Sequence, residues 1–362
     1  MLAEEGKLSL DDKVGKFLPT LTDADKITIR QLLSHTSGYR DYWPQDYAFA
    51  AMQNVVQPQQ ILDRWAKAPL DFAPGAQWQY SNTGFVAAGR IIEQVAREPL
   101  LAFLQRRVLK PLRIDAIDSA LATGPQNATG YMRYAAGPVR QVTPAAAGWL
   151  FAAGELAMST PDLAKWDISV INQSVLKPGS YAEQQRAVKL SDGADTGYGL
   201  GVDVGMVGSH RRISHGGAAV GFLTDNRIYP DDKAAVVVAA NADFGNAHQA
   251  IADGIEAMLF ADGNGTARAR GIYAQLLAGK IDRSQLTDNG NSYLTDEAAK
   301  DYQDTLVRLG EPQSFVAGKP KVRGGFTSER YTITYPGKKL VLIMRTEPAG
   351  GRIEQFMLFP AA

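Results

Sequence analysis

The sequence predicts an α+β protein of two domains, and three features lead to this prediction. Apolar residues recur at helical spacing through much of residues 25–171. From Tyr198 onwards the pattern changes to short apolar runs separated by turn residues, as in antiparallel strands. A small, polar segment then precedes a second set of helices and strands. We therefore expect a first domain over 1–262, a linker over 263–269 and a small α+β domain over 270–362.

The composition excludes several classes of function. Lysine and arginine together number 38, and so do aspartate and glutamate. A formal charge of zero argues against nucleic acid or an anionic membrane as the main partner, because both demand a basic surface. The chain has no cysteine, which excludes disulfides and thiolate metal sites. His210 and His248 lack metal-ligand spacing, so we predict no metal and no other cofactor.

The expected helices of the first domain follow from their start and stop signals. Ser159, Thr160 and Pro161 form a good helix start, and Ser37-Gly38 is expected to end the first helix. Asn82 leads into small and apolar residues at helical spacing. The segments expected to contain these helices are 25–40, 57–67, 82–96, 100–110 and 152–172, with a closing helix over 247–260.

The strands are expected in two groups. The first comprises "YGLGVDVG", "RRISHGG", "GFLTDNRIYP" and "KAAVVVAANA", and residues 120–140 read as loops or an edge hairpin. The second lies in 314–359, after helices over 270–310, and suggests a curved sheet over helices. That C-terminal domain is either a substrate-restricting accessory or a stabilising appendage. The longest apolar run, Ala234–Ala242, is too short to span a bilayer.

The N-terminus has two interpretations. Met1–Glu5 resembles the last turns of an apolar helix, with Gly6 as its C-cap. Since a domain rarely begins at the end of a helix, the segment is either a short frayed start or the remnant of a longer N-terminal region. We expect the second, with any signal peptide in that upstream region.

Three stretches carry residues suited to catalysis. Tyr80-Ser81-Asn82 precedes a helix, His215-Gly216-Gly217 lies on an expected strand, and "LLSHTSG" comes before both. Together with "EEGKLSLDDKVGKFLP", "FAPGAQWQYSNTGFVAAGRIIE", "STPDLAKWD", "YGLG" and "SHGGAAVGF", they resemble the serine β-lactamase and penicillin-binding-protein superfamily, in its class C and D-alanyl-D-alanine carboxypeptidase-like branch. The resemblance covers residues 1–260 or so and implies a β-lactamase/transpeptidase-like fold, an antiparallel sheet packed with helices beside an all-α lobe.

The resemblance also implies a reaction and the residues that perform it. The family transfers acyl groups through a serine, whose hydroxyl needs a neighbouring base. Tyr80 matches that base, provided that nearby cations lower the pKa of its phenol. Asn82 matches the amide that orients a lysine and the substrate. His215 replaces the lysine of the family's third motif.

Substrate contacts are implied further along the same strand. Gly216 and Gly217 let the backbone approach the substrate, and the N–H of Ala218 is a candidate oxyanion-hole donor. Two neighbours read as structural: His35 is expected to satisfy backbone groups near the site, and Ser81 to cap a helix or form a turn. Taken alone, Tyr80 and Asn82 would more often be a packing residue and an N-cap.

The nucleophile that these groups serve is not in the expected place. The family's Ser-x-x-Lys precedes its Tyr-x-Asn, whereas the one match here, Ser174 to Lys177, follows Tyr80 and is adjacent to Pro178. We read it as a surface loop and expect the serine upstream of Met1. Two explanations stay open: a truncated serine hydrolase, periplasmic or secreted in its full-length form, or a pseudoenzyme that binds peptides or peptidoglycan fragments without turnover.

The implied substrate is a small molecule or a peptide. A β-lactam, a D-alanyl peptide and a small ester are all open. His215 in place of lysine favours an esterase or D-amino-acid peptidase over a dedicated β-lactamase, because lysine would pair with the drug's carboxylate as a fixed charge, whereas histidine is neutral over much of the physiological pH range.

Overall fold

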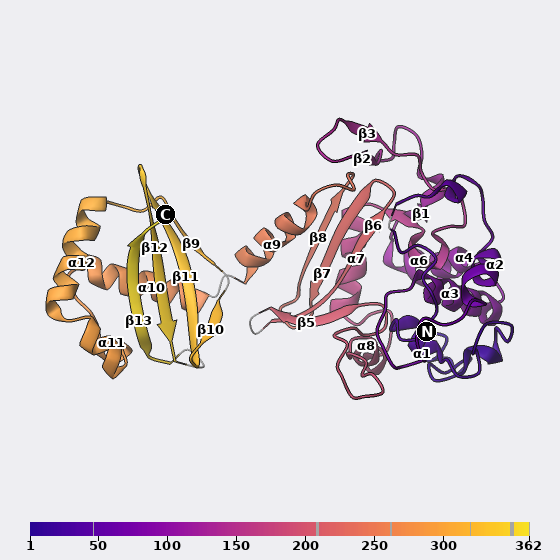
Figure 1. Cartoon of the computed structure of the whole chain (residues 1–362), viewed down its shortest axis with the longest axis horizontal. Helices are drawn as coiled ribbons and strands as arrows, with labels where there is room; N and C mark the ends of the chain where they lie inside the picture. Colours follow the sequence, from indigo (N-terminus) through magenta and orange to yellow (C-terminus); the bar gives the residue numbers. More distant parts are fainter. Residues whose placement is uncertain (46, 208–209, 261–262, 319, 348–350, 362) are drawn as a thin grey trace. The chain divides into compact units, whose positions relative to one another are not determined.

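The computed structural model describes residues 1–45, 47–207, 210–260, 263–318, 320–347 and 351–361. The backbone divides into two compact units, Met1–Ile255 and Glu256–Ala362, each built of helices and antiparallel strands (Figure 1). The predicted α+β class is confirmed. The boundaries predicted at 262 and 270 stay predictions.

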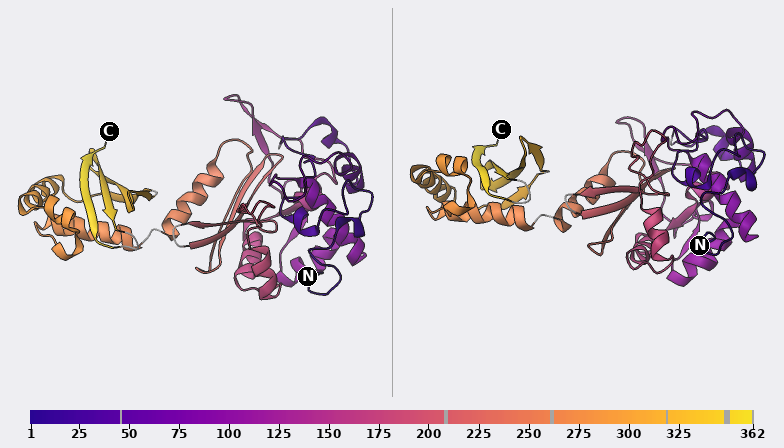
Figure 2. Two further views of the ribbon diagram at one scale, coloured as in Figure 1. Left: turned by 60° about the horizontal axis from the view of Figure 1, so that its bottom comes forward. Right: turned by 90° about the horizontal axis from the view of Figure 1, so that it is seen from below.

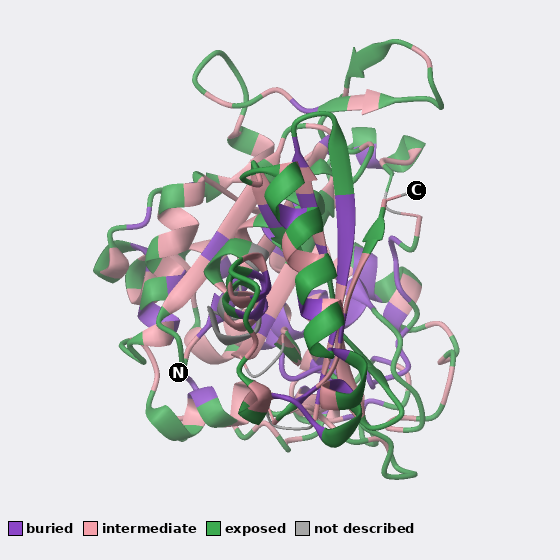
Figure 3. Ribbon diagram, turned by 90° about the vertical axis from the view of Figure 1, so that its left-hand side faces the viewer, coloured by how far each residue is buried: buried purple, intermediate pink, exposed green. Residues whose placement is uncertain are grey.

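The first unit begins with a helical lobe. Its core is a continuous cluster of apolar side chains that includes Ile27, Leu32, Ile61, Val86 and Trp149. The first half of α3 (Asn82–Ala96) is almost wholly buried in this core. Figure 3 colours the residues of the chain by how far each is buried. The helices of this lobe are α1 (Ile29–Leu33), η2 (Ala50–Gln53), α2 (Pro58–Ile61), η3 (Leu62–Ala66), α3 (Asn82–Ala96), α4 (Leu100–Leu104), η4 (Gln105–Leu109), α5 (Lys110–Leu112) and α6 (Phe151–Gly154), with a first 3-10 turn, η1 (Val14–Lys16), before them.

A four-stranded antiparallel sheet completes the first unit. Its strands, in spatial order, are β5 (Asp203–Val207), β6 (His210–Ala219), β7 (Phe222–Tyr229) and β8 (Ala234–Ala240). Helix α7 (Thr160–Ile171) packs on one face, where Val170, Ile213 and Ile228 share a small core. On α9 (Ala247–Leu259), Asp253 forms an ion pair with Arg227 of β7.

Two small pairings flank this sheet and the helical lobe. Strand β1 (Ala116–Asp118), followed by the turn η5 (Ser119–Leu121), pairs with β4 (Leu156–Met158). Strands β2 (Tyr131–Arg133) and β3 (Val139–Gln141) form a hairpin, in agreement with the hairpin expected between 120 and 140. Helix α8 (Pro178–Gln184) connects α7 to the sheet.

The second unit packs helices against one five-stranded antiparallel sheet (Figure 2). The strands follow the order β10 (Lys321–Arg323), β11 (Phe326–Tyr335), β12 (Lys338–Thr346), β13 (Ile353–Pro360), and β9 (Ser314–Ala317) also pairs with β11. Alternate residues of β12, Leu340, Leu342 and Met344, share a core with the helices. The helices are α10 (Gly263–Leu277), η6 (Arg283–Gln285), α11 (Asp288–Tyr293) and α12 (Asp296–Leu309).

Two local expectations differ from the structure. The first helix ends at Leu33 rather than at Ser37-Gly38, because His35 adopts a left-handed backbone with φ 57°. The linker expected over 263–269 forms the first half of α10 instead. Ala269, Ile272 and Leu276 are all fully buried, so tertiary packing outweighs a small, polar composition. Residues 261–262 lie outside the described residues.

Membrane-spanning helices and metal-binding clusters were both considered in the sequence. Among them, no helix is long and apolar enough to cross a membrane. The same part of the chain contains no group of three or more histidine and carboxylate side chains that could hold a metal ion.

Candidate functional site

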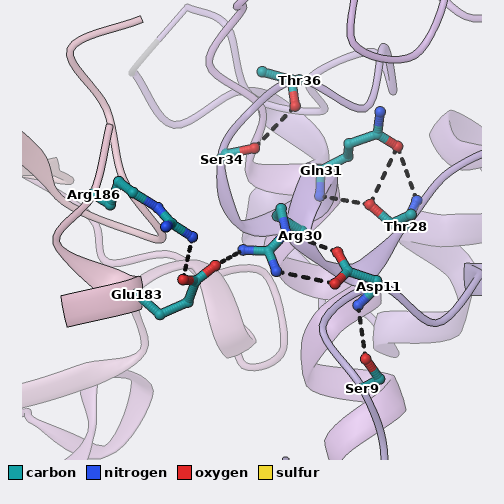
Figure 4. Close-up of polar contacts among 9 residues, drawn as sticks. All are labelled: Ser9, Asp11, Thr28, Arg30, Gln31, Ser34, Thr36, Glu183 and Arg186. Atoms are coloured by element: carbon teal, nitrogen blue, oxygen red, sulfur yellow. Dashed lines mark hydrogen bonds and ion pairs between the residues drawn. The ribbon is translucent and has the colours of Figure 1, made fainter. Parts of the chain in front are cut away.

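The site begins at helix α1, which a capping box fixes at its start. The N–H of Gln31 donates to Thr28 Oγ1 (3.2 Å), and the N–H of Thr28 donates to Gln31 Oε1 (2.9 Å). Arg30, one residue earlier, forms ion pairs with Asp11 and Glu183 (Figure 4). These contacts hold α1 in place, so the turn that follows it leaves at a defined position.

The turn after α1 is tied to the segment that leads to Tyr80. The N–H of Gln79 donates to His35 O (3.0 Å), and the N–H of Gly75 donates to Thr36 O (2.8 Å). Two backbone hydrogen bonds therefore bring residues far apart in sequence into register. The backbone of "LLSHTSG" thus fixes the position of the segment that contains "WQYSN".

The His35 side chain adds two hydrogen bonds to these backbone contacts. The N–H of Ser81 donates to His35 Nδ1 (3.1 Å), which therefore carries no proton. Nε2 then donates to the phenol oxygen of Tyr198 at 3.2 Å. Burial, followed by the charge of His215, lowers the pKa of His35 to about 3, so the ring is neutral at physiological pH. These contacts agree with the structural role expected of His35.

We expect His35 to make the stability of the first unit depend on pH. The pKa of His35 is about 3 in the folded protein and about 6.5 when the chain unfolds. Between these values only the unfolded state binds the proton, so this stabilising contribution is present above pH 6.5 and is lost as the pH falls towards 3. Between pH 6.5 and 5 the loss amounts to about 2 kcal/mol.

The measurement is urea unfolding at pH 7 and pH 5 for the wild type and for His35→Asn. Asparagine tolerates the left-handed backbone at this position. Burial raises the pKa of Asp167 to about 6 and that of Glu155 to about 7, and both contribute in the opposite direction. They are common to both proteins, so the difference isolates His35. An equal pH dependence in the two proteins would contradict the assignment.

Aromatic rings from four segments meet around Tyr80. The centroid of its ring lies 4.2 Å from that of His35 and 6.3 Å from that of His215. The rings of Tyr198 and His215 lie 6.2 Å apart. Tyr80 is 40% exposed, so part of this residue is open to solvent. The structure thus brings together Tyr80 and His215, which the sequence places on different elements.

Asn82 is the first residue of α3 and is buried. Its backbone N–H donates to Asp41 Oδ1 (3.0 Å), and its side-chain Nδ2 donates to Asp41 Oδ2 (3.3 Å). Ser81 occupies the N-cap position, as expected, but makes no side-chain cap. Its buried Oγ has no hydrogen-bond partner. A helix-capping or turn role was expected of Ser81. Its N-cap position is as expected, but its side chain makes no cap, because Asp41 supplies the acceptor.

His215 lies near the middle of β6. Its Nδ1 is 2.6 Å from the carbonyl oxygen of Gly216, which can only accept, so Nδ1 carries the proton. In the neutral ring, Nε2 is then an acceptor. In the described residues, the pairing of β5 with β6 extends only to Ser214. His215 therefore lies on the part of β6 that extends beyond the pairing with β5.

The three residues after His215 are exposed. A Cβ added to Gly217 would lie 2.5 Å from Thr224 Oγ1, so a larger residue here would displace the Thr224 side chain of the neighbouring strand. One at Gly216 would lie 3.3 Å from the Thr224 carbonyl oxygen, a closer approach than most side chains make. The substrate-binding role of Gly216 and Gly217, and the oxyanion role of Ala218, stay predictions.

The one Ser-x-x-Lys match lies on another part of the first unit. Ser174 follows α7 and donates to the carbonyl oxygen of Ser169, and Lys177 is the N-cap residue of α8. The N–H of Lys177 donates to Glu4. His210 is paired with Asp232. These residues have structural partners of their own, as expected for a chance match.

Sequence reasoning assigned no role to three residues that build this site. Tyr198 belongs to the quoted "YGLG", and its phenol contacts a histidine 163 positions earlier. Trp78 is 39% exposed, with its ring centroid 5.6 Å from that of Tyr198. Asp41 follows "HTSGYR" directly. An acidic residue close to a motif that resembles the family's was the available signal for Asp41.

The chain is similar in sequence to known proteins. A family model described as Beta-lactamase matches residues 1–257. Penicillin-binding protein 4* of Bacillus subtilis (strain 168) is 26% identical over 289 residues, covering 72% of this chain and 61% of the relative. The D-aminopeptidase of Brucella anthropi is 28% identical over 246 residues, covering 65% and 45%. The chain thus spans about half the length of the curated relatives that it matches.

Solved structures agree on the fold. The crystal structure of a D-stereospecific amidohydrolase from Streptomyces sp. superposes with a TM-score of 0.60 at 28% identity, over 67% of this chain and 77% of that one. The expected β-lactamase/transpeptidase-like architecture is confirmed.

Proposed function

The chain belongs to the β-lactamase family, and from this premise we propose that its site serves acyl transfer through a serine. The observation that carries the proposal is the approach of Tyr80 and His215, with ring centroids 6.3 Å apart, beside the first residue of α3. A phenol and an imidazole thus lie close together, and an amide follows the phenol by two positions in the chain. Such a set provides a base, a second hydrogen-bonding group and an orienting amide.

In this proposal, Tyr80 acts as the general base in its phenolate form. The serine Oγ attacks the substrate carbonyl carbon while its proton passes to the Tyr80 oxygen. The bond to the leaving nitrogen or oxygen then breaks, and the leaving group takes the proton from Tyr80. Water hydrolyses the acyl-enzyme by the same route in reverse. The His35 ring beside Tyr80 is neutral and supplies no positive charge, and we propose that the lysine of the Ser-x-x-Lys lowers the pKa of the phenol.

We assign the nucleophile to a Ser-x-x-Lys outside the 362 residues. The match at Ser174 is followed at once by a helix that begins at Pro178. Ser81 has its N–H bound to His35 and its Oγ buried. Neither arrangement places a serine and a lysine on one helical turn, which the family's mechanism requires.

The substrate class that we propose is a D-amino-acid amide, a D-amino-acid peptide or a small ester. The similar proteins include a D-aminopeptidase and a D-stereospecific amidohydrolase. His215 directs Nδ1 to the Gly216 carbonyl oxygen and so presents Nε2 as a hydrogen-bonding atom, in place of the fixed positive charge of a lysine. This favours an amide or ester over a β-lactam, whose carboxylate a lysine would bind.

Hydrolysis assays on two forms of the protein test the proposal. The chain of 362 residues is expected not to hydrolyse p-nitrophenyl esters, D-amino-acid p-nitroanilides or a chromogenic cephalosporin above background. A form that carries a Ser-x-x-Lys ahead of Met1 is expected to hydrolyse the first two.

Two results would overturn the proposal. Turnover by the 362-residue chain that a covalent serine inhibitor abolishes would place the nucleophile inside it. Inactivity of the longer form, together with tight binding of the same compounds, would favour a pseudoenzyme that binds peptides without turnover.

A further inference from the structure

The carboxylate of Asp41 is the centre of a buried hydrogen-bond network at the start of α3. Asp41 is 8% exposed. Its Oδ1 accepts the backbone N–H of Trp43 (3.1 Å) and that of Asn82 (3.0 Å). A carboxylate at a helix N-terminus satisfies a donor that has no partner within the helix and interacts favourably with the helix dipole. Asp41 thus caps α3 from a loop 41 positions earlier in the sequence.

The second oxygen of Asp41 determines how the Asn82 side chain points. Nδ2 of Asn82 donates to Asp41 Oδ2 at 3.3 Å. An ionised carboxylate can only accept, so the NH2 group of Asn82 has to face Asp41. The carbonyl oxygen Oδ1 is at the other end of the planar amide and therefore faces away from Asp41. One carboxylate fixes both the backbone and the amide orientation of this residue.

We propose that Asp41 is a positioning residue, which holds Asn82 so that its Oδ1 accepts a hydrogen bond from an N–H or ammonium donor during the reaction. The inference rests on the proposed function for the identity of the reaction, but not for the orientation of the amide. Donation to a carboxylate polarises the amide and makes Oδ1 a stronger acceptor. The site thereby favours substrates that present an N–H at this position, such as amides, over esters.

The substitution Asp41→Asn tests the orientation on the 362-residue chain, without any need for activity. The new side chain is nearly isosteric. Its oxygen can still accept the backbone N–H of Asn82, while its NH2 group then faces Nδ2 of Asn82. Two donors cannot pair, so the Asn82 amide is expected to turn by 180° and present its NH2 group outward.

Selective ¹⁵N-asparagine labelling and NMR detect this change. In the wild type, the side-chain NH2 signals of Asn82, assigned through their loss in Asn82→Ala, are expected to be protected from hydrogen exchange. In Asp41→Asn they are expected to shift and to exchange at least 10-fold faster. Unchanged Asn82 side-chain signals in Asp41→Asn would overturn the proposal, whatever the activity of the protein.

A matched control separates positioning from helix capping. Ser159 caps α7 by accepting the N–H of Asp162 at 3.2 Å. Ser159→Ala therefore removes a helix cap without touching the site. It is expected to lower the melting temperature to a similar extent as Asp41→Asn and to leave the Asn82 signals and the hydrolysis rate unchanged. If Ser159→Ala changed the Asn82 signals as Asp41→Asn does, the change would reflect lost stability and the proposed positioning role of Asp41 would be overturned.

A double-mutant cycle in the hydrolytically active form connects the orientation to the reaction. Asp41→Asn is expected to lower kcat for a D-amino-acid p-nitroanilide roughly 10- to 100-fold, the loss typical of removing a group that orients a functional side chain, and to lower kcat for a p-nitrophenyl ester less. In the background of Asn82→Ala it is expected to have little further effect. Independent, multiplying losses would overturn the proposal, whereas inactivity of the wild type would overturn only the proposed function.

Discussion

Replacing Tyr80 with phenylalanine is expected to lower the acylation rate roughly 10²–10⁴-fold in a form of the protein that carries the serine, the range usual for losing a general base. The substitution removes one oxygen from a side chain that is 40% exposed, so the packing of its ring on His35 is retained. The measurement is pre-steady-state release of p-nitrophenol. Folding is checked in parallel by thermal melting.

A second phenol provides the control. Tyr134 is 64% exposed and lies between β2 and β3, next to Arg140. Tyr134→Phe removes the same atom from the same residue type and is expected to leave the acylation rate unchanged. A rate that is insensitive to Tyr80→Phe would make the phenol a packing residue and assign the base role to another group.

The largest expected effect on stability is that of Gly38→Ala. Gly38 has φ +83°, and an added Cβ would lie 2.2 Å from the carbonyl oxygen of Phe72. The same glycine accepts the N–H of Asp71 (2.9 Å), so the two backbones cannot separate without losing that bond. Left-handed strain and steric overlap together are expected to lower the free energy of unfolding by about 2–5 kcal/mol.

Gly193→Ala separates the two causes. Gly193 has φ +88°, but an added Cβ would meet no atom within 4 Å. It therefore carries the strain without the overlap and is expected to cost about 1–2 kcal/mol. Urea unfolding of both variants gives the comparison. Equal losses would show that the contact between Gly38 and Phe72 can relax.

Local signals in the sequence predicted the parts of the fold that depend on neighbouring residues. The start of α3 at Asn82 and the start of α7 after Ser159 were predicted from residues next to them. The strand that carries His215 followed from turn residues on either side. In each case the deciding interactions span only a few positions.

The features that were missed depend on contacts between distant residues. Ser81 was expected to cap α3, but the acceptor comes from Asp41. Residues 263–269 resembled a linker, yet they form a helix because residues further along α10 are buried in the second core. The approach of Tyr198 to His35 likewise depends on the folded chain. Local composition carries no information on such partners, and tertiary packing decides the outcome.

The central claim is that Tyr80, Asn82 and His215 serve a serine that forms an acyl-enzyme. The most direct test is intact-protein mass spectrometry after rapid mixing with a p-nitrophenyl ester, followed by peptide mapping. The account predicts a mass increase of one acyl group on the serine of the Ser-x-x-Lys in the longer form, and no adduct on the chain of 362 residues. An acyl group on Ser81 or Ser174 of the 362-residue chain would contradict it.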